Sequence, residues 1–288
     1  MTIWESIILG LVQGLTEFLP ISSSAHLRIV GELIGSADPG AAFTAITQIG
    51  TEAAVLLYFR KDIATIVRAW WRAITGKNGT SWRERTGSTD HDARMAWWIA
   101  LGSVPIVVGG LLFEDAIDAT FRNLYLTVIT LTVFGVLLGV ADRFGKQERT
   151  LRSIGGRHAI LFGLAQAMAL VPGVSRSGGT ITMGRVLGYT REAAARYSFL
   201  LAIPAVLGSG IYKLVTSLDE LGTPGTPGAG AILVATLVAF VVGYVVIVWF
   251  LRLVSTRSYL PFVVYRVVLA VVVLVLLTTG VLTATGTV

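Results

Sequence analysis

Residues Gln13–His26, with the sequence QGLTEFLPISSSAH, interrupt an otherwise apolar N-terminal segment. Pro20 disfavours helix at the residue before it, and the serines that follow are good N-caps for a new helix. Gln13 and Glu17 are four positions apart, so they share one face of the first half-helix. The stretch therefore predicts two half-helices joined by a polar loop instead of a plain membrane-spanning helix.

A second stretch of the same kind, Pro172–Thr180, has the sequence PGVSRSGGT. The residues before the two breaks are also alike, because Gly10–Gln13 matches Gly163–Gln166 in kind and spacing. With a one-residue gap, Pro20–Ser24 then aligns with Pro172–Arg176, which pairs Ser23 with Ser175. The similarity predicts an internal repeat.

The composition places the chain in the membrane class. Of its 288 residues, 54% are hydrophobic and only 14% are charged, and its mean hydropathy is +0.74. Soluble domains carry nearer a quarter charged residues. Six stretches are apolar and long enough to span a bilayer: 43–60, 96–113, 124–141, 195–213, 230–251 and 262–283. They lack strand-like alternation, so we expect residues 1–288 to form one all-α polytopic membrane domain.

The charged residues predict which loops lie on which side of the membrane. The net charge is +6, and the basic residues gather in residues 60–94 and 142–158, which should be cytoplasmic. Arg252, Arg257 and Arg266 place the next loop inside as well. Acidic residues mark the outside loops: Glu114, Asp115, Asp118, Asp219 and Glu220. No nucleic-acid-binding motif accompanies the basic residues, the chain has no cysteine, and we expect no cleavable signal peptide.

These side assignments make the two broken regions re-entrant helix–loop–helix pairs. The first, 1–40, enters and leaves from outside, and the second, 158–192, from the cytoplasm. We expect an inverted-topology repeat with a first unit at 1–113, a second at 124–251 and a final spanning helix at 262–283. Interrupted helices at corresponding positions of inverted repeats predict a site near the middle of the membrane.

The residues of the two loops suit phosphoryl transfer. Two helix N-termini that meet at membrane depth form an anion site, and Arg176 adds a planar fork for phosphate oxygens. Glu17 and His26 add a carboxylate and an imidazole that could activate a nucleophile, hold a cation or protonate a leaving oxygen. We expect Ser22 and Ser24 to be caps. Glu52 could line the cavity or pair with Arg185, and the sequence leaves both open.

At these loops the chain resembles the undecaprenyl-diphosphate phosphatase family, the BacA-type bacitracin-resistance proteins. The resemblance covers most of the chain and rests on Gln13–His26, Pro172–Gly178 and Ser198–Pro204. It implies hydrolysis of a C55 isoprenyl diphosphate to the monophosphate and inorganic phosphate, which recycles the lipid carrier for cell-wall synthesis. It also implies a bacterial cytoplasmic membrane and an active site on its outer side, and we expect both termini outside.

The resemblance also assigns roles. It implies catalytic roles for Glu17, Ser23 and His26, and phosphate-binding roles for Ser175, Arg176, Ser177 and Thr180. A divalent cation, Mg²⁺ or Ca²⁺, is expected at Glu17, with Gln13 contributing its carbonyl oxygen. Family members often carry Glu where this chain has Gln13, so a cation bridged by two carboxylates of this helix is in doubt. The nucleophile stays open between Ser23, His26 and water.

The main alternative is an isoprenyl-phosphate flippase or secondary transporter, since inverted repeats with broken helices are common in transporters. A transporter needs anion binding but no acid–base group, so Glu17 with His26 favours the phosphatase. A purely structural membrane component would leave the polar loops unexplained. Expected partners are the polyprenyl diphosphate and membrane lipids, with no nucleic acid. A homodimer, the chain-length preference and the identity of the metal stay open.

Overall fold

The structure is a computed structural model that describes residues 1–35, 40–79, 81–113, 123–218 and 226–285. Within these ranges the chain is helical, with a single β-bridge between Arg149 and Tyr189 and no strand. The α-helices are α1 (Ile3–Thr16), α2 (Ser23–Leu33), α3 (Gly40–Tyr58), α4 (Arg60–Ile74), α5 (Trp82–Arg85), α6 (His91–Leu112), α8 (Leu124–Phe144), α9 (Gly156–Ala167), α10 (Arg176–Val186), α11 (Arg191–Thr216), α12 (Ala229–Thr256) and α13 (Leu260–Thr278). Two short 3₁₀ helices are η2 (Leu151–Ser153) and η3 (Met168–Leu170).

Five of the six expected membrane spans are single long helices, and the sixth is part of a bent helix pair. α6, α8, α11, α12 and α13 are each long and apolar enough to cross a bilayer. The remaining expected span, 43–60, is α3, and the chain bends by 77° between α3 and α4. Large apolar side chains stay exposed along the spans, as for Val241 and Val245 of α12 and Val268 and Val271 of α13. These outward faces suit contact with lipid, so the protein is a multi-pass, all-α membrane protein.

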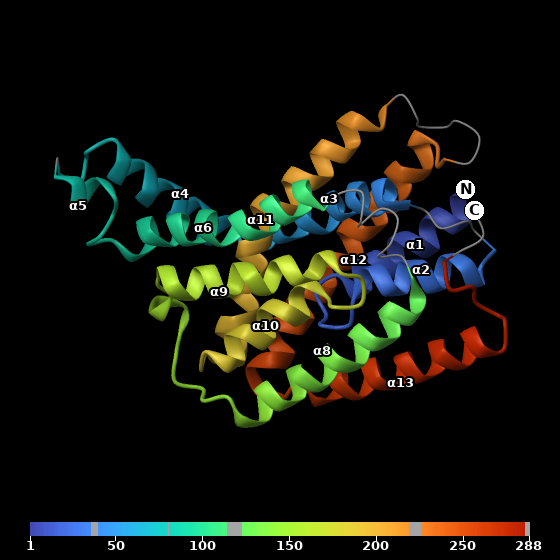
Figure 1. Ribbon diagram of the computed structural model, residues 1–288. Coiled ribbons are helices and arrows are strands. Elements are labelled where there is room, and N and C mark those ends of the chain that lie inside the picture. The colour runs from blue at the N-terminus through green and yellow to red at the C-terminus, as the bar shows by residue number, and fades with distance from the viewer. Residues whose placement is uncertain (36–39, 80, 114–122, 219–225, 286–288) are drawn as a thin grey trace.

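The two broken regions are helix–loop–helix pairs that enter the molecule from opposite ends. In Figure 1, α1 runs inward from the right-hand end and α2 returns to it, while α9 runs inward from the left-hand end and α10 returns there. Their loops meet near the middle of the molecule (Figure 1). α13 ends at the same right-hand end where α1 begins, and the small basic helix α5 lies at the left-hand end.

Equivalent glycines let the two first half-helices pack closely on long helices. A Cβ added to Gly10 of α1 would lie 2.6 Å from the carbonyl oxygen of Ala235 in α12. A Cβ added to Gly163 of α9 would lie 2.3 Å from that of Gly102 in α6. Small residues at such contacts let helix backbones approach one another, as is common in membranes. The matched sequence thus has a matched packing role.

The structure corrects the alignment of the two repeats. Ser22 and Ser175, not Ser23 and Ser175, are the equivalent residues, because each is the N-cap of its second half-helix. The run from Gln13 to Ser22 is as long as the run from Gln166 to Ser175, so no gap is needed. The gap came from matching Pro20 with Pro172 by residue type. Ser23 therefore corresponds to Arg176, a pairing that matters at the site.

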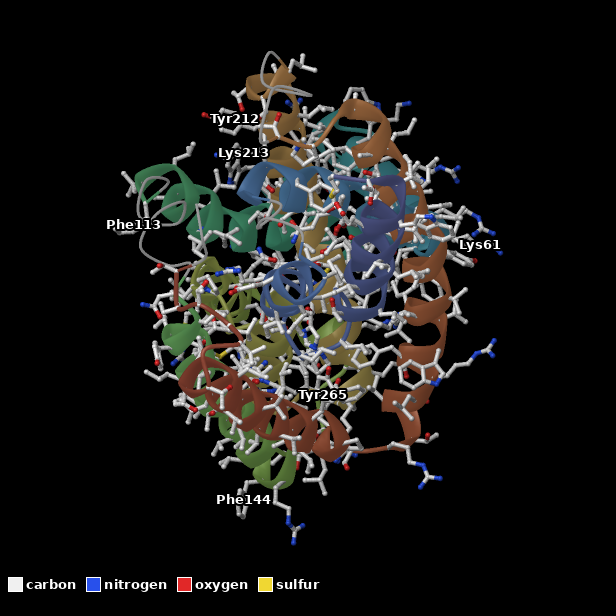
Figure 2. The ribbon with its side chains drawn as sticks, turned by 90° about the vertical axis from the view of Figure 1, so that its right-hand side faces the viewer. Lys61, Phe113, Phe144, Tyr212, Lys213 and Tyr265 are labelled. Carbon is white, nitrogen blue, oxygen red and sulfur yellow. The ribbon has the colours of Figure 1, made fainter. Side chains whose placement is uncertain are left out.

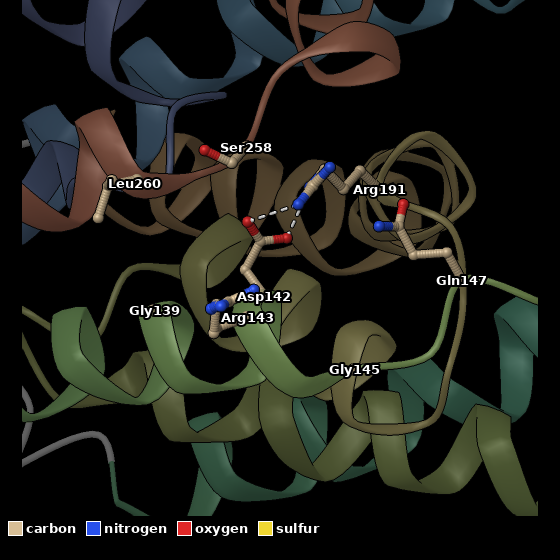
Figure 3. A pocket seen from close by; sticks show the side chains of 8 residues that line it. All are labelled: Gly139, Asp142, Arg143, Gly145, Gln147, Arg191, Ser258 and Leu260. Atoms are coloured by element: carbon tan, nitrogen blue, oxygen red, sulfur yellow. Dashed lines mark hydrogen bonds and ion pairs between the residues drawn. The ribbon is translucent and has the colours of Figure 1, made fainter.

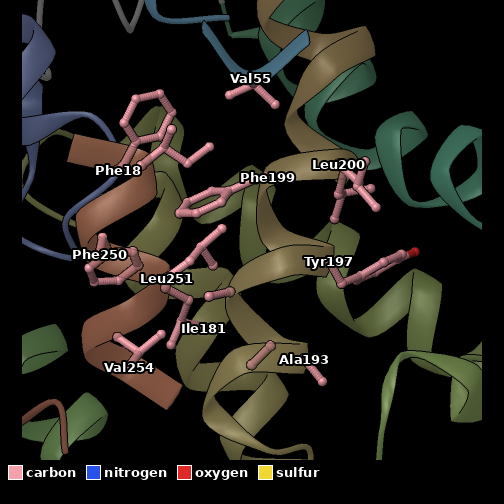
Figure 4. Packing of buried hydrophobic residues seen from close by; sticks show 14 of the residues in the cluster. Phe18, Val55, Ile181, Ala193, Tyr197, Phe199, Leu200, Phe250, Leu251 and Val254 are labelled. Atoms are coloured by element: carbon pink, nitrogen blue, oxygen red, sulfur yellow. The ribbon is translucent and has the colours of Figure 1, made fainter. Parts of the chain in front are cut away.

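A buried aromatic core supports the loops. Phe18 follows Glu17 directly, is fully buried, and packs edge-on against Phe199 of α11 with ring centroids 5.3 Å apart. Phe199 in turn lies against Phe250 of α12. Figure 4 shows these three rings close together. This packing anchors the end of α1 and so sets where Glu17 can point.

A separate polar cluster joins the helix ends near the end of α8. Asp142 accepts hydrogen bonds from Arg185, Arg191 and the backbone N–H of Tyr259. Arg185 is fully buried and also donates to backbone carbonyls of residues 142, 145, 146 and 189. A cavity of about 320 Å³ beside Asp142 and Arg191 is shown in Figure 3. Arg185 therefore forms its ion pair with Asp142, and the alternative in which it pairs with Glu52 is wrong.

The two proposed repeat units, 1–113 and 124–251, and the separate final helix 262–283 stay a prediction. The acidic residues taken to mark the outside loops lie outside the described residues.

Candidate functional site

Both loop tips hold a serine in an unusual backbone conformation. Ser22 has φ 74° and Ser175 has φ 70°, and they are the only non-glycine residues with positive φ among those the structure describes. The hydroxyl of Ser22 accepts from the N–H of Ala25, and that of Ser175 from the N–H of Gly178. Positive φ costs a residue with a side chain about 1–3 kcal/mol, and such strain concentrates at functional sites. The two strained caps aim the N-termini of α2 and α10 at one another's loops.

Glu17 is the point on which side chains from three parts of the chain converge. Its Oε2 accepts from Gln13 Nε2 at 2.8 Å and from Ser23 Oγ at 2.7 Å, and Gln48 Nε2 of α3 lies 3.5 Å away. Its Oε1 pairs with Arg176 Nη2 at 2.9 Å. Glu17 is 5% exposed, so these groups compensate a carboxylate withdrawn from water.

The corrected alignment gives this convergence a simple origin. Ser23 and Arg176 are each the first residue of their second half-helix. Because the two helices approach tip to tip from opposite ends, their first residues both reach Glu17. The same position of the repeat thus carries a hydroxyl (Ser23) in the first loop and a guanidinium (Arg176) in the second.

The guanidinium of Arg176 has N–H donors that are not used in hydrogen bonds within the protein. Its side chain is 10% exposed, and its Nε and Nη1 are buried without a partner among the described residues. Next to it, Ser177 Oγ donates to the carbonyl oxygen of Leu19 at 2.9 Å and fastens the second loop to the first. Buried guanidinium donors are normally satisfied, so the free ones indicate room for an anion.

Arg266 of α13 holds the two loops together. It is fully buried, and its guanidinium donates to the carbonyl oxygens of Pro20, Gly173, Val174, Thr130 and Leu131 at 2.8–3.2 Å. The prediction that Arg266 marks a cytoplasmic loop is wrong, because this residue lies inside the protein between both loop tips. A lone arginine within an apolar span is itself a signal of a functional or structural site, which was available in the sequence.

His26 is close to the first loop but is not directed at Glu17. Its Nδ1 lies 2.7 Å from the carbonyl oxygen of Ser22, and its Nε2 lies 2.7 Å from the hydroxyl of Tyr265. A carbonyl can only accept, so Nδ1 carries the proton and Nε2 accepts from Tyr265. Tyr265, labelled in Figure 2, is itself 44% exposed. The histidine therefore supports the strained Ser22 in this state.

Thr180 is also turned away from Glu17. It is fully buried, and its hydroxyl lies 2.5 Å from that of Ser198 in α11 and donates to carbonyl oxygens of its own helix. Ser175 and Ser177 stay beside the tip, with their hydroxyls 3.2 Å apart. The structure thus brings Gln13, Glu17, Ser23, Arg176 and Ser177 together and places His26 and Thr180 in supporting positions. The catalytic and phosphate-binding roles of all these residues stay predictions.

The oxygen atoms around Glu17 fit a hard divalent cation. Gln13 Oε1 is buried and has no partner, and the same is true of Glu52 Oε1 on α3. Glu52 is 1% exposed and lies within electrostatic range of Arg176 and Glu17. The described residues contain no cluster of three or more His, Cys, Asp or Glu side chains that could hold a metal. Two carboxylates with an amide oxygen are a donor set suited to Mg²⁺ or Ca²⁺.

Comparisons with known proteins give the family of this chain. Residues 6–272 match the family described as bacitracin resistance protein BacA. This chain belongs to the BacA family. The match takes in both re-entrant loops, Glu17, Arg176 and Arg266.

Relatives named undecaprenyl-diphosphatase match over nearly their whole length. An undecaprenyl-diphosphatase of Micrococcus luteus is 60% identical over 285 residues, covering 99% of this chain and 100% of the relative. One of Kineococcus radiotolerans is 60% identical over 284 residues, covering 99% and 97%. One of Bifidobacterium adolescentis is 55% identical over 285 residues, covering 98% and 97%.

Proposed function

We propose that this protein is an undecaprenyl-diphosphatase, which hydrolyses undecaprenyl diphosphate to undecaprenyl phosphate and inorganic phosphate. The product is the lipid carrier that cell-wall synthesis reuses. The observation that carries the proposal is the meeting of Ser23, Glu17 and Arg176 at the tips of two membrane-embedded half-helices. A hydroxyl, a base and a phosphate-binding guanidinium within one buried site are the parts that phosphoryl transfer requires.

The diphosphate binds where the two loops meet. The first turns of α2 and α10 present N–H groups that have no partner within the helix, and their dipoles favour an anion. Arg176 offers Nε and Nη1 to the phosphate oxygens, and Ser175 and Ser177 stand beside it. Arg266 adds a fixed positive charge behind both loops. The isoprenyl chain lies along an apolar outer face, in contact with membrane lipid.

Glu17 accepts the proton of the attacking hydroxyl. Ser23 Oγ already donates to Glu17 Oε2 at 2.7 Å, which is the arrangement of a nucleophile with its base. Attack on the terminal phosphorus by Ser23, or by a water in its place, forms a new P–O bond and breaks the bond to the lipid monophosphate. A phosphoserine would then be hydrolysed by water, with Glu17 again as the base. His26 is held by Ser22 and Tyr265, so its geometry favours support of the loop over attack.

A divalent cation belongs to the proposal as a charge neutraliser. Glu17 and the unpartnered Gln13 Oε1 would hold Mg²⁺ or Ca²⁺, which when bound draws charge from phosphate oxygens.

The protein lies in the bacterial cytoplasmic membrane with its basic end in the cytoplasm. The basic loops 60–94 and 142–158 lie at the end opposite the start of α1, which supports this orientation. Both termini and the opening of the site then face outward.

Release of inorganic phosphate from a long-chain isoprenyl diphosphate by the purified protein tests the activity. Arg176→Ala should lower the rate about 100-fold or more, because the developing phosphate charge loses its buried partner. Arg152→Ala is a matched control, since Arg152 is exposed on the basic end and should leave the rate unchanged. Equal rates for wild type and Arg176→Ala would refute the assignment of the site.

The same preparation separates hydrolysis from transport. Protein reconstituted in vesicles that moved the lipid across the bilayer without releasing phosphate would favour the flippase instead.

A further inference from the structure

Glu52 is a buried carboxyl group at the site that the proposed reaction does not use. It lies on α3, one turn after Gln48, whose Nε2 is 3.5 Å from Glu17 Oε2. Residues one turn apart share a helix face, so Glu52 faces the same site. It is 1% exposed, and its Oε1 has no hydrogen-bond partner among the described residues. Arg176 and Glu17 are the charged groups within electrostatic range of it.

The charges of this site do not balance. Glu17 and Glu52 are two buried carboxyl groups, and Arg176, the guanidinium near both, is already paired with Glu17 at 2.9 Å. Arg266 donates only to backbone carbonyl oxygens, so it pairs with neither carboxyl group. A buried carboxylate without a partner is strongly unfavourable, and an incoming diphosphate adds negative charge to the same place. An ionised Glu52 would therefore need further positive charge next to it.

We propose that Glu52 and Glu17 together hold one divalent cation beside Arg176. Glu52 supplies from α3 the second carboxylate that α1 lacks because position 13 is glutamine. Both ligands are oxygen donors, which selects a hard cation such as Mg²⁺, Ca²⁺ or Mn²⁺. The inference rests on the proposed function only in expecting a diphosphate at Arg176, and the cation site can be measured without substrate.

Binding of Mn²⁺ to the purified, chelator-stripped full-length protein tests the proposal, with free Mn²⁺ counted by electron paramagnetic resonance. Wild type should bind one Mn²⁺ per chain. Glu52→Gln keeps the shape of the side chain and should weaken binding by about tenfold or more. Glu148→Gln removes an exposed carboxylate near the end of α8 and should bind as wild type does.

Thermal unfolding in detergent shows whether a loss of Mn²⁺ binding reflects misfolding. Wild type should gain stability on adding Mn²⁺, because ligand binding favours the folded state. Glu52→Gln should unfold at least as high as wild type in chelator, since it lacks the buried unpaired carboxyl, and should gain little from Mn²⁺. A misfolded variant would instead unfold lower in chelator.

Two binding results would overturn the cation site: Glu52→Gln binds Mn²⁺ with the affinity of wild type, or wild type binds no Mn²⁺ up to millimolar concentration. A Glu52→Gln protein that unfolds at a lower temperature than wild type in chelator would overturn it as well. Absence of Mn²⁺ binding together with equal stability of wild type and Glu52→Gln in chelator would mean that Glu52 carries a proton instead. Phosphate release is measured in parallel. A wild type that binds Mn²⁺ through Glu52 but releases no phosphate would remove the proposed function and leave the cation site standing.

Discussion

Arg266 joins parts of the chain that are far apart in sequence, and its five N–H groups match five backbone carbonyl oxygens. Arg266→Lys keeps the charge but has fewer donors on a flexible stem, so it leaves buried carbonyls unpaired. We expect a loss of stability of about 2–5 kcal/mol and a marked loss of phosphate release. Thermal unfolding and the phosphate assay measure both. Arg257→Lys, at an exposed position between α12 and α13, is the control, and equal effects of the two changes would contradict the role of Arg266.

The strained caps can be tested at Ser175. Ser175→Gly relieves the positive φ and keeps a fair N-cap, whereas Ser175→Ala keeps the strain and loses the hydroxyl that accepts from Gly178. Alanine should therefore be less stable than glycine here by about 1 kcal/mol, the reverse of their usual order within a helix. Thermal unfolding of the two variants gives the order. Ser22 should behave alike, and a more stable alanine variant at either position would show that the backbone is not strained.

The packing of whole half-helices makes a prediction at Gly163. A Cβ there would lie 2.3 Å from the carbonyl oxygen of Gly102, so Gly163→Ala must push α9 away from α6. We expect a lower unfolding temperature and reduced phosphate release, because α9 leads into the loop that carries Arg176. Gly208→Ala on α11 meets nothing within 4 Å and should be neutral or slightly stabilising, since alanine favours helix. If both changes had the same effect, the close approach of α9 and α6 would not matter.

Elements with a local signal were predictable from the sequence. The spans follow from runs of apolar residues, and the two breaks follow from proline followed by serines, which act within a few residues. Contacts between elements were less accessible. Arg176 and Glu17 are 159 positions apart, and an arginine in a polar loop does not reveal that its partner is a carboxylate on the other loop.

The errors have physical causes of the same kind. Arg266 was judged by its charge and its place near the start of a span, although its burial depends on carbonyls from three other segments. The repeat alignment followed residue type at Pro20, although backbone geometry at Ser22 and Ser175 defines the equivalence. Glu52 was left open because only the fold shows that Arg185 is bound to Asp142.

At the scale of the whole molecule, the inverted arrangement explains why two similar loops do different work. A helix–loop–helix pair that enters from one side can reach only part of the membrane, but two pairs from opposite sides meet at their tips (Figure 1). Both tips supply N–H donors and a strained cap, while the first adds Glu17 and Ser23 and the second adds Arg176. In the proposed function, the near-symmetry of the loops builds the anion site, and the differences between them supply the catalytic groups.

The orientation of the whole molecule is testable because the chain has no cysteine, so a single introduced thiol can be labelled without background. Thr279 is exposed just after α13, at the end where α1 begins, and Glu148 is exposed in the basic segment that follows α8. The basic loops should be retained in the cytoplasm. In intact cells, a membrane-impermeant maleimide should therefore label Thr279→Cys and should label Glu148→Cys only after permeabilisation. Phosphate release by both variants verifies that they are folded. The reverse labelling pattern would show that the protein has the opposite orientation, with the first loop and Glu17 opening to the cytoplasmic side.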